Sequence, residues 1–201
     1  MLPKLPKSTG SVMVFTFICM CFTAVASVVL VISLLFTRQK LLSVTGAVLK
    51  TSFGDITIRF ESTPSQARDN FIRLSQVDFY HNLRFHRVVD NFAIQTGDPL
   101  SRDLSAVSRW GSGGPGYSFP LEASVSDQLS TGSVVMVREN TESHGSQFMI
   151  LVDDIPWLAG QNSKFASVTE GMEIAKAISH LSTGPTNIPA QEVWLLDIIL
   201  K

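Results

Sequence analysis

A succession of short β-patterned segments between Gly46 and Lys201 constrains the fold more than any other feature. They either alternate apolar and polar residues or are continuously apolar over a few positions, as strands do. The segments expected as strands are 47–53, 56–60, 85–89, 92–95, 132–138, 147–152, 165–168 and 192–200, the first two forming a hairpin. Many short strands with few helices favour a closed antiparallel β-barrel, because closure removes unpaired sheet edges.

Two segments have helical spacing instead. Thr63-Pro64-Ser65 is a helix-start signal, and apolar residues follow it at near-helical intervals, so a helix is expected over 65–76. A second helix is expected over 172–181. Residues 100–118 show little strand pattern and are expected to be a long loop, where function often lies.

The N-terminal segment differs in character from the rest. Residues 8–37 contain no charged side chain, and Ser11–Phe36 is a run of 26 mostly apolar residues. About 20 apolar residues suffice for a helix to cross the bilayer core. The chain is therefore expected to consist of a tail (1–10), an uncleaved transmembrane helix (11–36), a linker (37–45) and one domain (46–201).

Two alternatives to the membrane anchor fit the sequence less well. Ala24-Val25-Ala26 offers a signal-peptide cleavage site, but a cut there would leave the apolar run SVVLVISLLF exposed. A buried soluble helix would show a polar face at this length. The basic residues on the two sides are balanced, and a short tail usually stays in the cytoplasm. We therefore expect a single-pass protein with an extracytoplasmic domain.

Charge and cysteine content exclude several classes of function. Residues 46–201 carry 12 basic and 17 acidic side chains, so no nucleic-acid partner is expected. Both cysteines, Cys19 and Cys21, lie in the apolar run. No histidine or cysteine spacing suggests a metal site, and no cofactor is expected.

Two motifs mislead. Residues 111–116 (GSGGPG) match the dinucleotide fingerprint letter by letter, but Pro115 and the absence of a following helix favour a tight glycine-rich loop. His144-Gly145-Ser146 suggests a nucleophilic serine, but the residues after Ser146 do not form a nucleophile elbow.

A more informative pattern surrounds Arg87, which stands beside His86 in the apolar context FHRVVDNFAIQTGDP (85–99). Burying an unpaired charge is energetically costly, so the guanidinium is expected to have either an ion-pair partner or a functional role. A carboxylate partner would be a purely structural explanation. Two further segments, GSQFMI (145–150) and Trp157-Leu158, offer amide and apolar side chains but no nucleophile, base or metal ligand.

With these motifs, residues 46–201 resemble the cyclophilin-type peptidyl-prolyl cis/trans isomerases, in a bacterial-like form with a membrane anchor. The matching motifs come in order along the chain: FGDITIRF, ARDNF, FHRVVDNFAIQTGDP, GSGGPGY, GSQFMI, WLAG and TEGMEIAKAI. The resemblance implies a mainly β fold, a closed eight-stranded antiparallel β-barrel capped by two α-helices.

The resemblance also implies roles for individual residues. The catalytic arginine falls on Arg87. The substrate-binding positions fall on His86, Phe92, Ala93, Gln95, Val137, Arg138, Gln147, Met149, Trp157, Leu158 and Asn162. Five of these positions depart from the residues usual in the family: Ala93 (usually methionine), Met149 (phenylalanine), Val137 (alanine), Arg138 (asparagine or arginine) and Asn162 (histidine). These differences bear on substrate preference and rate more than on the fold.

The leading expectation is therefore a membrane-tethered, monomeric prolyl isomerase that acts on proline-containing peptides and unfolded proteins. The alternative is a catalytically weak module that binds proline peptides as a chaperone or scaffold. A third reading makes the domain a structural part of a membrane assembly.

Overall fold

The computed structural model describes residues 26–33, 43–63, 65–124, 127–139 and 143–201. The chain divides into two compact units, residues 1–43 and 44–201. In the first unit residues 26–33 are helical and expose their apolar side chains. Among the described residues no helix is both long enough and apolar enough to cross a membrane. Most of the predicted span 11–36 lies outside those residues.

The second unit is mainly β. Its strands and helices are, in chain order, β1 (Gly46–Thr51), β2 (Gly54–Phe60), α2 (Gln66–Gln76), β3 (Leu83–Arg84), β4 (Arg87–Val89), β5 (Ala93–Thr96), the 3-10 helices η1 (Pro99–Arg102) and η2 (Leu104–Arg109), β6 (Phe119–Pro120), β7 (Ser133–Arg138), β8 (Ser143–Leu151), the 3-10 helix η3 (Pro156–Leu158), β9 (Lys164–Glu170), α3 (Met172–Ser179) and β10 (Trp194–Leu200).

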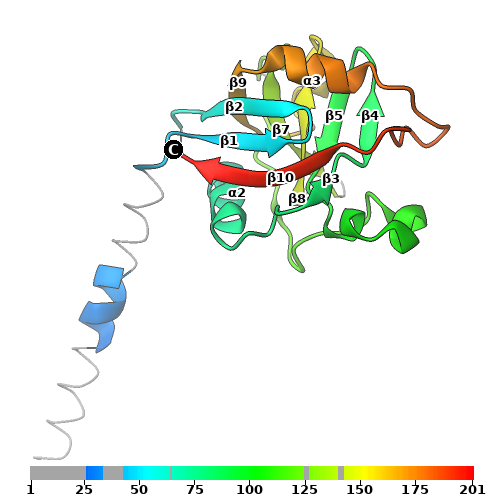
Figure 1. The fold of residues 1–201 in the computed structure, drawn as a ribbon. Helices are drawn as coiled ribbons and strands as arrows, with labels where there is room; N and C mark the ends of the chain where they lie inside the picture. The colour runs from blue at the N-terminus through cyan, green and yellow to red at the C-terminus, as the bar shows by residue number, and fades with distance from the viewer. Residues whose placement is uncertain (1–25, 34–42, 64, 125–126, 140–142) are drawn as a thin grey trace, which may run out of the picture. The chain divides into compact units, whose positions relative to one another are not determined.

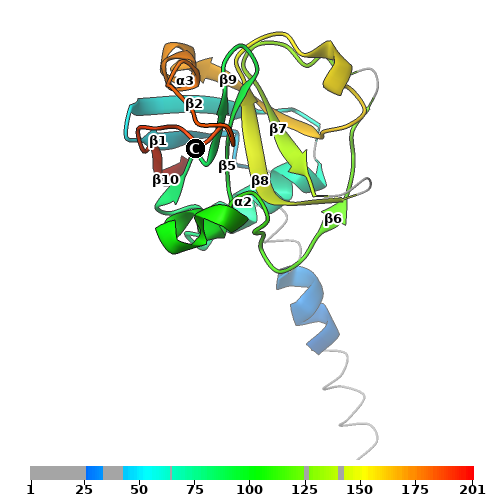
Figure 2. The same cartoon turned by 90° about the vertical axis from the view of Figure 1, so that its right-hand side faces the viewer.

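All strands join one antiparallel sheet that curls on itself (Figure 1). The order is β3-β10-β1-β2-β9-β7-β8-β5-β4, and β6 pairs with the start of β8 away from this path (Figure 2). The sheet therefore has ten strands in the described part of the chain, and its edge strands β3 and β4 do not pair with each other. The prediction of a closed eight-stranded barrel is wrong in both respects, although the mainly β, antiparallel architecture is confirmed.

The sheet stays open because the backbone groups at its two edges have partners other than each other. Only Phe85 and His86 separate β3 from β4. The Phe85 backbone N–H donates to the carbonyl of Val193 at 2.9 Å, which extends the pairing of β3 with β10. The Val88 N–H donates to the carbonyl of Asn187 at 2.8 Å. On the side of β3 that faces away from β10, the Arg84 N–H donates to the Ser101 hydroxyl at 3.0 Å, and the Arg84 carbonyl accepts from the Thr96 hydroxyl at 2.9 Å. Both edges are thus satisfied without closure, as buried backbone polar groups require.

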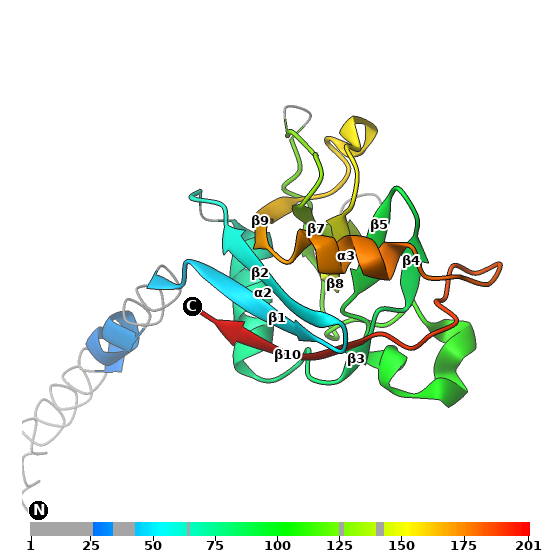
Figure 3. The same ribbon diagram turned by 45° about the horizontal axis from the view of Figure 1, so that its top comes forward.

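The two helices cover opposite ends of the curled sheet (Figures 1 and 3). Helix α2 begins as predicted at Ser65, whose hydroxyl accepts from the Arg68 N–H at 3.2 Å. Its Phe71 is fully buried and packs edge-on against Phe148, with ring centroids 5.3 Å apart. Helix α3 lies against β2, β4 and β5. The sequence-predicted helices and hairpin are therefore confirmed.

The segment expected as a loop over 100–118 contains two 3-10 helices instead. Asp98 and Asp103 cap them: their carboxylates accept from the N–H groups of Leu100 at 2.7 Å and Ser105 at 2.8 Å. Pro99 occupies the first helical position, where its missing N–H costs nothing. Capping thus gives residues 98–109 a fixed shape despite their lack of apolar periodicity.

Candidate active site

The site is built on a row of side chains that crosses neighbouring strands. Arg87 of β4 stands opposite Gln95 of β5, and Gln95 stands opposite Met149 of β8. Directly opposed residues share a face of the sheet, so the three side chains lie side by side. Strand pairing alone therefore brings together a cation, an amide and a thioether from three separate segments.

Next to this row lies an apolar cluster. Ala93 and Met149 are buried in it, together with Leu129, Val135, Leu151 and Ile155. Phe92, Val137 and Leu158 pack against it and remain partly exposed. The cluster thus brings together Phe92, Met149 and Leu158, three of the predicted substrate-binding residues, and Phe92 and Leu158 leave part of it open to solvent.

Arg87 is half-buried, and no ion pair to it exists among the described residues. Its Nη1 lies 3.5 Å from Oε1 of Gln95, a long and weak hydrogen bond. Its guanidinium carbon lies 5.5 Å from the ring centroid of Phe92, within the range of a cation–π contact. Burial lowers the pKa of Arg87, but an arginine stays charged at physiological pH.

A buried carboxylate, Asp98, lies near His86, the neighbour of Arg87, but its oxygens are already used in hydrogen bonds to the backbone. Asp98 is fully buried, and its oxygens accept hydrogen bonds from the backbone N–H groups of Leu100, Gly111 and Gly113. The structural explanation for Arg87, a carboxylate partner, is therefore not what the described residues show.

His86 points to the interior. The residue is 3% exposed, and neither ring nitrogen has a partner in hydrogen-bond geometry among the described residues. Burial lowers the pKa of His86, and the nearby charge of Asp98 opposes this effect more weakly. A buried neutral imidazole beside Arg87 adds no second positive charge to the site.

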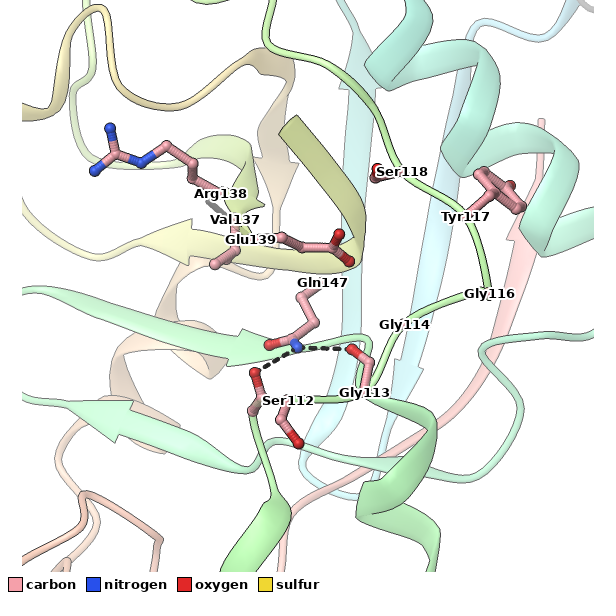
Figure 4. Close-up of a pocket in the computed structure, with 11 residues that line it drawn as sticks. Ser112, Gly113, Gly114, Gly116, Tyr117, Ser118, Val137, Arg138, Glu139 and Gln147 are labelled. Atoms are coloured by element: carbon pink, nitrogen blue, oxygen red, sulfur yellow. Dashed lines mark hydrogen bonds between the residues drawn. The ribbon is translucent and has the colours of Figure 1, made fainter. Parts of the chain in front are cut away.

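Two glutamines link Arg87 to the glycine-rich loop. The Nε2 of Gln95 donates to Oε1 of Gln147 at 2.8 Å. The Nε2 of Gln147 in turn donates to the carbonyls of Gly111 and Gly113, both at 2.9 Å (Figure 4). Gln147 therefore serves to brace the loop, a role beyond the substrate contact that the sequence suggested.

The same loop and the end of β7 enclose a cavity of about 710 Å³ that extends from Gln147. Figure 4 shows Glu139 reaching into it from the end of β7, with Gly114 and Gly116 on the opposite wall. Burial raises the pKa of Glu139. The loop can pass this close only without a side chain at Gly113, where a Cβ would clash with Oδ1 of Asp98. The interpretation of 111–116 as a tight glycine-rich loop agrees with this geometry.

The remaining predicted site residues differ in their exposure to solvent. Trp157 on η3 is 64% exposed, and Arg138 is exposed at the end of β7. Val137 sits at an irregularity in the β7–β8 register. Asn162, a predicted substrate-binding position, is buried, and its Nδ2 donates to the carbonyl of Met136 at 3.0 Å. Its amide therefore holds the chain before β9 to β7.

Ser146, the serine considered above as a nucleophile, has a structural role. Ser146 is buried and donates to the carbonyl of Gly97 at 2.7 Å. His144 contacts a different serine, Ser163, through Nε2 at 2.8 Å. Within the part of the chain that the structure describes, no cluster of metal-ligating side chains occurs. The arrangement thus offers hydrogen bonds from a fixed cation next to an apolar surface.

Comparison with known proteins agrees with this geometry. Residues 47–199 match the family model described as cyclophilin type peptidyl-prolyl cis-trans isomerase/CLD. The peptidyl-prolyl cis-trans isomerase-like 1 of Emericella nidulans is 34% identical over 155 residues, which are 76% of this chain and 92% of that protein. The mouse peptidylprolyl isomerase domain and WD repeat-containing protein 1 is 34% identical over 158 residues, 77% of this chain.

The chain spans about a quarter (24%) of the length of the mouse protein. These relatives, from a fungus and a mammal, do not support the expectation of a bacterial-like cyclophilin. The family match covers residues 47–199, so the comparison gives no support to a membrane anchor in residues 11–36.

Solved structures show the same fold. The cyclophilin type peptidyl-prolyl cis-trans isomerase of Cryptosporidium parvum aligns with a TM-score of 0.69 and 25% identity over 79% of this chain and 98% of that one. A structure of that protein in the presence of the dipeptide Ala-Pro aligns with a TM-score of 0.68. The chain therefore belongs to the family of cyclophilin-type peptidyl-prolyl cis-trans isomerases.

Proposed function

We propose that the chain catalyses cis/trans isomerisation of X–Pro bonds in peptides and unfolded proteins, with Arg87 as the catalytic residue. The proposal rests on the surroundings of the Arg87 guanidinium. This group has no carboxylate partner among the described residues, and it lies over Phe92 beside the apolar cluster. A proline ring seated against that cluster would present its nitrogen to the cation.

The reaction needs little chemistry from the protein. Rotation about an X–Pro bond is opposed by resonance, with a barrier of about 20 kcal/mol, which corresponds to roughly 0.01 per second. A turnover of about 10 per second requires three decades, or about 4 kcal/mol. A hydrogen bond to a charged group contributes about 1.5–3 kcal/mol. One such bond, felt most when the peptide bond is twisted, therefore supplies a large share of the acceleration.

Five side chains of the site have a part in this mechanism. Arg87 would donate to the prolyl nitrogen and hold its lone pair out of resonance. Phe92, Met149 and Leu158 would hold the ring, and the low-dielectric surface would strengthen the hydrogen bond. Gln95, hydrogen-bonded to Arg87, would set the direction of the guanidinium. No bond is broken, so no nucleophile is needed.

A protease-coupled isomerisation assay on a proline tetrapeptide tests the proposal. Arg87→Ala is expected to lower kcat/KM by about 100-fold, as the loss of a charged hydrogen-bond donor implies. Arg87→Lys keeps the charge but loses the planar set of donors, so it should restore little. Arg73→Ala, at an exposed arginine on α2, is the matched control and should leave the rate unchanged.

The same assay separates the enzyme from the alternative module. Peptide binding without rate enhancement in the unmutated chain would contradict catalysis and favour a weak proline-peptide-binding chaperone or scaffold. The small Ala93 and the flexible Met149 in the cluster motivate that alternative, since both change the shape of the surface that holds the ring.

We further propose that residues 11–36 anchor a monomeric protein to the membrane, with residues 46–201 on the extracytoplasmic side. The support is the uncharged apolar run and the exposed apolar side chains of the helical residues 26–33. A reporter fused after Lys201 that is active only on the cytoplasmic side would contradict this placement, and extraction by carbonate without detergent would contradict the anchor.

A further inference from the structure

A second cavity opens at Arg87, away from the apolar cluster. It measures about 320 Å³, and its walls include Arg87 and Gln95 from the candidate site. The opposite walls are Val107 and Trp110, in and just after η2, and Ile188 in the segment before β10. The mechanism proposed above uses none of these three apolar residues.

This cavity adjoins another of about 230 Å³. Val107, Trp110 and Ile188 line both, and Leu104, Pro189, Ala190 and Val193 add apolar walls to the second. Together they form one groove, which we call the η2 groove. It begins at Arg87 and runs between η2 and residues 186–190. In Figure 1 both segments lie on the right-hand side of the domain, the orange-red segment before β10 above the green 3-10 helices.

The groove exposes apolar surface. Leu104 is 57% and Val107 is 43% exposed. A single exposed apolar residue needs no explanation, but several that line one groove next to a candidate active site point to a binding surface.

One wall of the groove is fixed to the core by Arg84. Its Nη1 donates to the carbonyls of Ser101 at 2.6 Å and Arg102 at 2.9 Å, and its Nη2 pairs with Glu192 at 3.1 Å. Its guanidinium carbon also lies 5.5 Å from the ring centroid of Trp110. The buried Arg84 therefore links the η1 and Trp110 side of the groove to Glu192, which lies in the segment before β10.

The other wall is fixed as well. The carbonyl of Asn187 accepts from Val88 of β4, and Thr183 forms an isolated β-bridge with Pro189. Both walls are thus formed before any ligand binds. A preformed groove loses little conformational entropy on binding a ligand, which favours affinity.

We propose that the η2 groove binds a large apolar side chain of the substrate polypeptide next to the proline, so that the enzyme prefers such substrates. This inference rests on the proposed function. The occupant follows from continuity: a chain whose proline nitrogen faces Arg87 must continue past Arg87, and the groove starts there. Successive residues of an extended chain advance by about 3.3 Å, so only the nearest few residues of the substrate can enter it.

The test uses seven-residue peptides with a central proline among alanines. Phenylalanine or serine replaces one alanine at a time, on either side of the proline, and kcat/KM is measured for each. In the unmutated chain we expect the phenylalanine peptide to exceed the serine peptide by about tenfold at one position, the discrimination typical of an apolar pocket. In Val107→Ser this ratio should fall to about two.

Val77→Ser is the matched control, because Val77 is 70% exposed and lies outside the groove. It should keep the ratio of the unmutated chain. Ratios within twofold at every position, or an equal fall in both variants, would overturn the inference.

A failure of the proposed catalytic function would give a different result from a failure of the groove proposal. If the unmutated chain isomerises none of the peptides, the catalytic proposal fails, while calorimetric affinities for the same phenylalanine and serine peptides still test the groove. A tenfold affinity ratio that Val107→Ser removes and Val77→Ser keeps would support the groove, and its absence would overturn it.

Discussion

Gln95 donates its side-chain N–H to Oε1 of Gln147 at 2.8 Å, and this bond couples the orientations of the two glutamine amides. Because Nε2 of Gln147 donates to the carbonyls of the glycine-rich loop, its Oε1 can only accept. Nε2 of Gln95 must therefore face Gln147, which turns Oε1 of Gln95 toward Arg87. The backbone of residues 111–113 thus orients the guanidinium through two side chains.

The first prediction concerns Gln95→Glu. A carboxylate cannot donate to Gln147, and it would draw Arg87 into an ion pair. Both effects compete with the hydrogen bond to the prolyl nitrogen, so kcat should fall about 100-fold while KM changes less than threefold.

Gln95→Leu is the comparison for this prediction. It removes the orienting acceptor without introducing a charge and should lower kcat by only about tenfold. Equal losses in the two variants would show that Gln95 does not act through Arg87.

The second prediction separates the ring-holding surface from the core. Phe92 is partly exposed, so Phe92→Ala should cost less than about 2 kcal/mol of unfolding free energy, since little apolar area is removed from the interior. It should nevertheless raise KM for proline peptides and lower kcat/KM by more than tenfold. Phe148→Ala, at a fully buried ring, should instead cost about 3–5 kcal/mol. Urea unfolding and the isomerisation assay together measure both effects.

Much of this architecture could be predicted from the sequence, because local patterns determine it. Alternation in residues 56–60 marks β2, and Ser65 marks the start of α2. The predicted positions of Arg87, Phe92, Gln95 and Met149 also come together, since they stand on paired strands or on the turn between two of them. Motif order was therefore enough to assemble the centre of the site.

What depends on contacts distant in the sequence was not predicted. The open sheet arises because Ser101 and Thr96 satisfy the outer side of β3 and Asn187 satisfies that of β4, and no local pattern predicts these contacts. The burial of Asn162 depends on the carbonyl of Met136 in another strand. The capping of η1 had a readable signal, the pair Asp98-Pro99, which is typical of a helix start.

The third prediction concerns Asp98→Asn. The carboxylate of Asp98 accepts three backbone hydrogen bonds in a fully buried position. An asparagine would present an NH₂ group to at least one backbone donor, leaving donors unpaired. Urea unfolding should show a loss of about 2–4 kcal/mol, the range for a charged acceptor and its orphaned partners.

Asp103→Asn is the control for Asp98, because Asp103 caps η2 at an exposed site and asparagine is an equally good cap. It should cost less than about 0.5 kcal/mol. A loss at Asp98 no greater than that at Asp103 would show that the glycine-rich loop is held by other contacts.

The fourth prediction is a pH dependence of stability that comes from two buried histidines. Burial lowers the pKa of His86 and of His144, with opposing effects of Asp98 and Glu122 that are smaller. The unfolded chain keeps a histidine pKa of about 6.5 and so binds more protons than the folded chain below that pH. The stabilising contribution of both groups is therefore complete above about pH 6.5 and declines as the pH falls.

The measurement is the free energy of unfolding in urea, which should decrease from about pH 7.5 to about pH 5. His86→Phe and His144→Gln should each reduce the slope of this free energy against pH, and the double variant should reduce it most. A free energy that stays constant or increases over this interval would show that neither imidazole is held neutral by its burial.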